Sequence, residues 1–87
     1  MIIRDKCVTL NLRNSGTLPV RLIVEPWAEE LSFPPGAEWN VVCESPRLDP
    51  IPIEILDGTI LIFGVSRSMV RIFSGEECIW ECFPALD

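Results

Sequence analysis

Hydrophobic and polar residues alternate with a period of two along most of this chain. This period is typical of strands that bury one face and expose the other, because successive side chains of a strand point to opposite sides. Seven or eight segments show the alternation, and no segment has a convincing helical period. The predicted strands are residues 6–13, 18–25, 29–33, 38–44, 51–56, 59–65, 69–73 and 77–83.

Turn-forming residues separate these segments. Pro35 and Gly36 suit the two central positions of a type II turn, because glycine accepts the positive φ that the second position requires. The pair Asp57-Gly58, between two alternating segments, predicts a tight hairpin. Pro26 is expected to end the second strand because it cannot donate a hydrogen bond, and Pro52 suits an edge strand or a strand start.

Short strands at roughly ten-residue spacing predict an all-β protein. Eighty-seven residues leave room for one hydrophobic core, so we expect a single β domain over residues 1–87. The predicted architecture is a small antiparallel β-sandwich or an open barrel of seven to eight short strands, since both give the same alternation. We also expect the segments from residue 51 onward to follow one another as a meander.

The charge of the chain excludes two classes of partner. Thirteen acidic residues stand against seven basic ones, which gives a net charge of −6 at pH 7. An acidic domain without a basic cluster cannot neutralise phosphates, so we expect no nucleic-acid partner and no membrane partner. The first residues lack the apolar core of a signal peptide, and no apolar run approaches the ~20 residues that span a bilayer. We therefore expect a cytoplasmic location.

The usual catalytic side chains are missing from the sequence. Histidine and tyrosine are absent, and lysine occurs once, at Lys6. Histidine is the usual general base near neutral pH and the commonest imidazole ligand of metals. We therefore predict that the protein is not an enzyme and has no catalytic residue, no cofactor and no bound metal.

The cysteines, Cys7, Cys43, Cys78 and Cys82, include no C-x-x-C pair of the kind found in zinc sites. In a strand over 77–83, the α-carbons of Cys78 and Cys82 lie about 13 Å apart. A disulfide requires roughly 4.4–6.8 Å, so this pair cannot bridge. Cys43, Cys78 and Cys82 are in phase with apolar faces. We interpret the cysteines as reduced and structural; the alternatives are a bridge between Cys7 and Cys82, and metal or redox chemistry.

The densest unusual stretch is residues 25–36, which gathers Glu25, Glu29, Glu30, Trp27 and two proline turns. It has the form E-P-W-x-E-x(4)-P-P-G and is followed by an alternating strand. In this form it resembles a segment of small uncharacterised bacterial proteins. The resemblance implies a bacterial β domain and brings no activity with it.

Two hypotheses fit this stretch. In the first, Glu25, Glu29 and Glu30 pair as acid and base or bind a hard cation such as calcium, and Trp27 stacks on a sugar or a base. In the second, which we favour, Trp27 packs across one end of the fold and the carboxylates hydrogen-bond exposed backbone. Arg71 suits an anion but more often such an arginine pairs with a neighbouring glutamate. The candidate ligand- or partner-binding residues are Glu25, Trp27, Glu29, Trp39 and Arg71.

The predicted function is that of a non-enzymatic binding or protein-interaction module that self-associates. In the segment 59–65, Ile60 and Ile62 alternate with Leu61 and Phe63, and a sheet that is apolar on both faces is covered on both faces. In so small a chain we expect one cover to be another subunit and predict a homodimer, with a different protein as the second candidate partner. The alternative function is a small-molecule-binding β-barrel similar to a cupin-like scaffold without metal.

Overall fold

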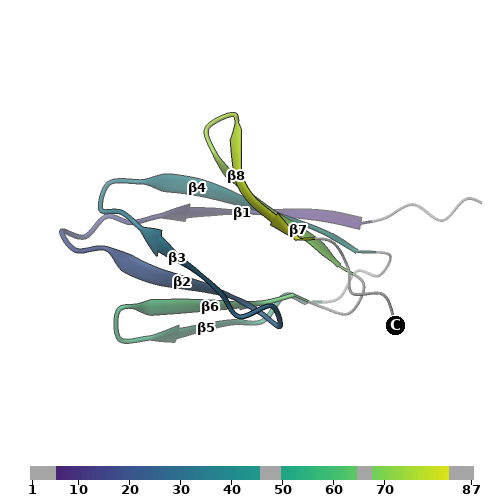
Figure 1. The fold of residues 1–87 in the computed structure, drawn as a ribbon, viewed down its shortest axis with the longest axis horizontal. Coiled ribbons are helices and arrows are strands. Elements are labelled where there is room, and N and C mark those ends of the chain that lie inside the picture. The colour runs from purple at the N-terminus through teal and green to yellow at the C-terminus, as the bar shows by residue number, and fades with distance from the viewer. Residues whose placement is uncertain (1–5, 46–49, 65–67, 83–87) are drawn as a thin grey trace, which may run out of the picture.

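The protein folds into two layers of β-sheet (Figure 1). The computed structural model describes residues 6–45, 50–64 and 68–82, and no helix occurs among them. Sheet A has the order β1-β4-β7-β8, with β1 (Lys6–Arg13), β4 (Glu38–Ser45), β7 (Met69–Ser74) and β8 (Glu77–Cys82). Sheet B has the order β3-β2-β6-β5, with β2 (Val20–Glu25), β3 (Glu29–Phe33), β5 (Ile53–Leu56) and β6 (Thr59–Phe63).

The all-β prediction is confirmed, and each predicted strand has its counterpart in the structure. β2 begins at Val20 rather than at residue 18, and β5 begins at Ile53 rather than at residue 51. The predicted strand ends at Val65 and Phe83 lie outside the described residues. The two sheets stack as a sandwich, which alternation alone did not distinguish from a barrel.

The predicted antiparallel pairing and the expected meander from residue 51 onward each have one exception. β2 and β6 are parallel neighbours, with Leu22 opposite Ile60, although the other described pairs are antiparallel. β6 and β7 do not pair, because β6 belongs to sheet B and β7 to sheet A. Alternation determines which face a residue takes. It carries no information on the direction of a strand or on the sheet that the strand joins.

The hydrophobic core lies between the sheets and draws on both of them. Alternate residues of β2 and β6 meet alternate residues of β4 and β7 there. The fully buried aliphatic side chains are Leu22, Val24, Val41, Ile62, Val70 and Ile72. Burial of one such side chain contributes about 1.5–3 kcal/mol to the free energy of unfolding. The period of two seen in the sequence is thus the period of the core.

Two turns have their predicted geometry. The Ala37 amide donates a hydrogen bond of 3.1 Å to the Pro34 carbonyl, and Gly36 has a φ of +81°, as a type II turn requires. Gly58 has a φ of +69° in the Asp57-Gly58 turn that joins β5 to β6. Glycine adopts these positive φ values without the steric cost of a β-carbon.

None of the four cysteines forms a disulfide, and one of them lies on a different face from the one that its phase predicted. Cys43 is buried and Cys82 is half-buried, as expected for structural cysteines. Cys78 is exposed, so its assignment to an apolar face is wrong. A register shift between Ile72 and Phe73 sets Cys78 opposite Phe73, on the outer row of sheet A. A bulge of this kind moves the following residues to the other face.

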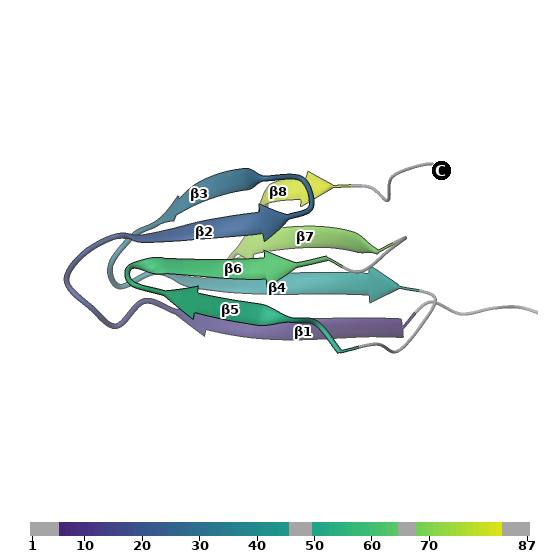
Figure 2. The ribbon, with the colours of Figure 1, turned by 90° about the horizontal axis from the view of Figure 1, so that it is seen from below.

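The sandwich has two open sides, each made of two edge strands. β5 and β1 are the edge strands on one side, and β3 and β8 are the edge strands on the other (Figure 2). An edge strand has a row of backbone groups that no neighbour in its own sheet satisfies. The character of each edge therefore decides where another chain can pair.

Candidate functional site

The turn between β2 and β3 brings Glu25, Trp27 and Glu29 together at one end of sheet B. Pro26 ends β2, as predicted, because the strand stops at Glu25. The Trp27 ring lies 6.0 Å from the ring of Trp80 in β8, edge to face with an interplanar angle of 63°. Such pairs stabilise a fold by about 0.5–1.5 kcal/mol beyond the area that they bury.

Gly64 makes room for the Trp27 ring. A β-carbon added at Gly64 would lie only 2.8 Å from an atom of that ring. The Gly64 amide donates a hydrogen bond of 2.6 Å to the Glu25 carbonyl, which holds the two backbones at this distance. Trp27 therefore packs against sheet A and the end of β6, in agreement with the structural hypothesis.

Glu29 is exposed and Glu25 is half-buried, so the two carboxylates have different surroundings. Glu29 is close enough to β8 to act on Cys82: burial and the Glu29 carboxylate together raise the pKa of the Cys82 thiol. Both effects disfavour the thiolate, which is the reactive form of cysteine. The surroundings of Cys82 near Glu29 therefore disfavour its reactive thiolate form.

The other two candidate residues lie elsewhere. Trp39 is buried, and its ring lies 4.6 Å from the ring of Phe33, at the opposite end of β3 from Glu29. Arg71 lies on the outer row of sheet A, where its Nη1 is 3.0 Å from Glu44 and its Nε is 3.5 Å from Glu81. The expected pairing of Arg71 with glutamates is confirmed. The five candidates therefore occupy three separate places.

The most exposed apolar surface of the described chain is at β5. Ile55 is 76% exposed, Leu56 is 54% exposed and Ile53 is 42% exposed. Ile53 and Ile55 belong to the inward row of sheet B, because they are paired with Ile62 and Ile60 of β6. At the edge this row has no further strand of its own sheet beside it.

The hydrogen-bond pattern of β5 determines which of its backbone groups face outward. In a hairpin closed by two residues, the residues next to the turn form a hydrogen-bonded pair, and such pairs alternate along the strands. The pair of Leu56 with Thr59 is next to the turn. Four residue pairs further on, in phase with this alternation, the Phe63 amide donates a hydrogen bond of 3.0 Å to the Pro52 carbonyl. It follows that the backbone N–H and C=O groups of Ile53 and Ile55 point to the open edge.

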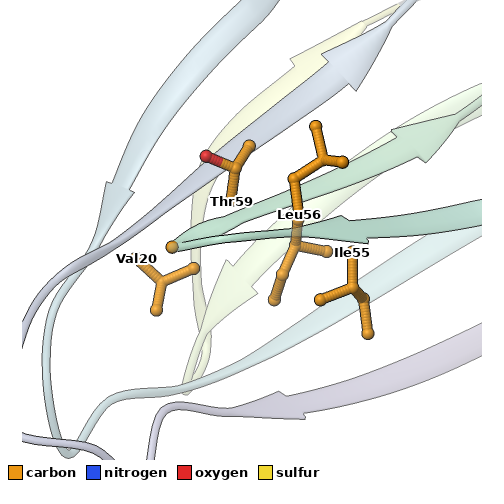
Figure 3. A pocket seen from close by; sticks show the side chains of 6 residues that line it. Val20, Ile55, Leu56 and Thr59 are labelled. Atoms are coloured by element: carbon orange, nitrogen blue, oxygen red, sulfur yellow. The ribbon is translucent and has the colours of Figure 1, made fainter.

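A pocket of about 170 Å³ lies beside this edge, at the closed end of the hairpin. Val20 and Ile55 point to one side of the hairpin, while Leu56 and Thr59 point to the other (Figure 3). Ile60 and Gly58 complete its lining, which is mostly apolar. The volume is below the roughly 300–1,000 Å³ of drug-sized ligand sites. It suits an apolar side chain of a partner.

The remaining edge strands are protected by polar and charged side chains. β3 exposes Glu29 and Glu30, and β8 exposes Glu77 and Glu81 beside its register shift. β1 exposes Thr9, Asn11 and Arg13. Charges and bulges on an edge prevent it from pairing with other chains. In the described chain, β5 is the edge with the weakest protection, since Glu54 is its one charged residue.

Ile53, Ile55 and Leu56 are not among the predicted site residues, although the sequence contains a signal for them. Pro52 already indicated an edge strand or a strand start, and it stands directly before β5. An apolar segment predicted as an edge strand is expected to keep its aliphatic side chains exposed. The combination of Pro52 with the apolar segment that follows it therefore predicts the exposed side chains of β5.

Comparison of the chain with protein-family models, with curated proteins and with solved structures gives no match. Within residues 6–45, 50–64 and 68–82, no group of three or more cysteine, aspartate or glutamate side chains is arranged to hold a metal ion. The same part of the chain contains no helix that could cross a lipid bilayer. The likeness of the segment 25–36 to bacterial proteins stays a prediction.

Proposed function

We propose that this chain is a non-enzymatic interaction module that forms a homodimer through the β5 edge of sheet B. The observation that carries the proposal is the 76% exposure of Ile55, on an edge strand whose neighbours Ile53 and Leu56 are also exposed. Exposed apolar groups that lie together on a small protein mark a contact surface. Their burial against a second chain supplies the free energy of association.

The outer row of sheet B supports the same conclusion. Leu61 and Phe63 alternate with the inward-facing Ile60 and Ile62, and both are half-buried rather than solvated. Ile23 stands opposite Leu61 in the parallel pair. The outer row of β6 is therefore apolar, and Ile23 extends it, whereas the Arg21–Glu30 ion pair lies further along the same face of sheet B. A partner that arrives at β5 extends this apolar surface.

The alternative is a small-molecule binder. The pocket beside Val20 and Ile55 favours it in one respect, since it is concave and apolar. Its volume of about 170 Å³ restricts it to ligands of few atoms. A thermal-shift screen separates the two functions, because a ligand at a hundredfold excess over its Kd stabilises the fold by about 2.7 kcal/mol at any protein concentration. Self-association instead makes Tm depend on the concentration of the chain.

The proposal is tested by sedimentation velocity or light scattering on reduced protein from about 1 to 100 µM, the range in which a micromolar Kd, about −8 kcal/mol, is measured. We expect the mass to rise from that of one chain to that of two. A protein that stays monomeric at the highest concentration overturns the proposal.

A matched pair of variants locates the surface. Ile55→Thr removes an apolar contact at β5 and is expected to raise Kd about tenfold, which corresponds to ~1.4 kcal/mol. Val42→Thr makes the same type of change on the outer row of sheet A, where Val42 stands opposite Arg71, and is expected to leave Kd unchanged. Equal effects of the two substitutions would contradict a contact at β5.

We infer a cytoplasmic location for this module. None of the four cysteines is in a disulfide, and the Cys7 and Cys78 thiols are exposed. Exposed thiols of this kind suit a reducing compartment, because oxidising compartments convert them to disulfides. Non-reducing electrophoresis of the protein from freshly lysed cells is expected to show a single-chain band; a disulfide-linked form would contradict this location.

A further inference from the structure

We propose that two copies of this chain join their β5 strands edge to edge and antiparallel, with Ile53 opposite the partner's Ile53 on a twofold axis. The inference rests on the proposed function and specifies the geometry of its homodimer. It joins the two copies of sheet B, each of four strands, into one continuous sheet. A twofold axis is the commonest symmetry of soluble dimers, and it requires a surface that is complementary to itself.

The backbone of β5 is prepared for a second strand. The N–H and C=O groups of Ile53 and Ile55 point outward, and those of Glu54 and Leu56 point to β6. No described hydrogen bond of the chain uses the outward groups of Ile53 or Ile55. In an antiparallel pair, two residues of this kind that face each other exchange two N–H···O bonds. Pairing with a second copy therefore satisfies groups that the isolated chain leaves to water.

Pro52 does not obstruct the open edge. Its carbonyl accepts the Phe63 amide, so the backbone groups of residue 52 face β6. The N–H that proline lacks is consequently missing on the inner side of the hairpin. The outward donors of the strand itself, the Ile53 and Ile55 amides, are both present.

The side chains favour one register. The series Ile51, Ile53, Ile55 reads the same in both directions, so a twofold axis at Ile53 sets each isoleucine against an isoleucine of the partner. In this register Glu54 stands opposite the partner's Pro52. An axis at Glu54 would instead set two carboxylates directly opposite each other, which destabilises a pair of strands.

The turn excludes a third register. An axis at Ile55 would set Ile53 opposite the partner's Asp57, which lies in the turn after β5 and not in the strand. The axis at Ile53 gives three facing isoleucine pairs, with Ile51 supplied by the chain directly before β5, whereas an axis at Pro52 gives two. The self-complementary pattern and the position of the one charge, Glu54, are what identify the second copy as the occupant.

Amide hydrogen exchange tests the pairing directly. In a monomer the Ile53 and Ile55 amides have no acceptor and exchange rapidly, whereas the Glu54 amide donates to β6 in either state. Between dilute and concentrated protein we expect the exchange of Ile53 and Ile55 to slow by about tenfold or more relative to that of Glu54, because protection follows the population of the closed form. Rapid exchange of Ile53 in a fully dimeric sample overturns the pairing.

Cysteine cross-linking tests the register, in a background in which the exposed Cys7 and Cys78 are replaced by serine. Two hydrogen-bonded residues that face each other have α-carbons about 5.5 Å apart, within the reach of a disulfide. Ile53→Cys is therefore expected to form a disulfide-linked dimer under mild oxidation. Glu54→Cys is the matched control and is expected to stay unlinked, because its two copies are offset along the strands.

The outcomes separate the inference from the function on which it rests. A dimer by light scattering with efficient linkage at Ile53→Cys supports both. A dimer that links better at Glu54→Cys, or at neither position, overturns the register or the β5 pairing and leaves the self-associating module standing. A monomer at all concentrations overturns both. Ile53→Pro adds a further check: it removes one outward N–H and is expected to abolish dimerisation, while Ile53→Val keeps it.

Discussion

The side-chain amide of Asn14 donates a hydrogen bond of 3.0 Å to the backbone carbonyl of Phe33, the last residue of β3. The same nitrogen donates 2.9 Å to the Leu18 carbonyl, and the Asn14 Oδ1 accepts 3.0 Å from the Gly16 amide. Asn14 itself is only 5% exposed. One buried side chain thus ties the connection between β1 and β2 to the end of β3 and holds the two sheets in position.

We expect Asn14→Ala to lower the free energy of unfolding by about 2–3 kcal/mol, because it leaves buried carbonyl groups without a donor. Asn11→Ala is the control: Asn11 bonds to Asn40 on the exposed outer row of sheet A, and its loss should cost less than about 1 kcal/mol. Urea denaturation of both variants measures the difference. Equal losses would show that Asn14 has no special role.

We expect Gly64→Ala to destabilise the fold through the Trp27 ring, since the added β-carbon would lie 2.8 Å from it. A clash of this kind typically costs about 1–3 kcal/mol. In the background Trp27→Leu the ring atoms are gone, so the same substitution should cost much less. A double-mutant cycle by thermal unfolding gives the coupling. A cost that is the same in both backgrounds would place the strain of Gly64→Ala in the backbone instead.

Ionisation of the Cys43 thiol makes the free energy of unfolding depend on pH in the alkaline range. Burial, and to a lesser extent Cys7, raise its pKa from 9.0 to about 11. The contribution of Cys43 to the free energy of unfolding is complete below pH 9 and is lost as the pH rises to about 11. Over this range the Cys43 thiol ionises in the unfolded chain but stays protonated in the folded chain. The loss amounts to roughly 2–3 kcal/mol.

Cys43→Ala is expected to flatten this part of the pH dependence, although it lowers stability at neutral pH by leaving a small void. Unfolding in urea from pH 7.5 to 11 measures both effects. An unchanged slope in Cys43→Ala would assign the alkaline loss to other groups. Cys82, whose pKa is also raised, contributes in the same direction.

We expect Arg71→Gln to cost at most about 1 kcal/mol, because the ion pairs of Arg71 with Glu44 and Glu81 are partly exposed to solvent. The coupling to Glu44→Gln, measured in a double-mutant cycle, should shrink in 1 M salt through screening. Neither substitution is expected to change Kd for the dimer. A large loss of dimerisation on Arg71→Gln would point to a partner on the outer row of sheet A.

Local chemistry explains which parts of the fold were predictable. The Pro34-Pro35-Gly36 and Asp57-Gly58 turns formed as expected because their backbone angles depend on the residues at those positions. Cys78 was misplaced because the register shift after Ile72 is a property of the β7–β8 pair, and neither strand shows it alone. The parallel neighbours β2 and β6 could not be predicted for the same reason.

The candidate site residues also fall into those that local sequence predicts and those that only the tertiary structure reveals. The segment of Glu25, Trp27 and Glu29 was found because its residues are adjacent in the chain. Trp39 and Arg71 are far from this segment in the sequence, and no local pattern placed them beside it. In the structure Trp39 packs against Phe33, and Arg71 pairs with Glu44 and Glu81. The exposed edge at Ile53 and Ile55 was missed because a strand becomes an edge only when the order of the sheet is known.

The amino-acid sequence by itself determined the strands, two of their turns and, except around Cys78, their inward and outward rows, because side-chain alternation and turn geometry act over a few residues. Tertiary structure alone decided the partition into two sheets, the parallel pair of β2 with β6 and the exposure of β5. These features depend on which distant segments pack together to bury the most apolar surface. That choice is made by the whole chain at once, and it is what leaves Ile53 and Ile55 at an open edge.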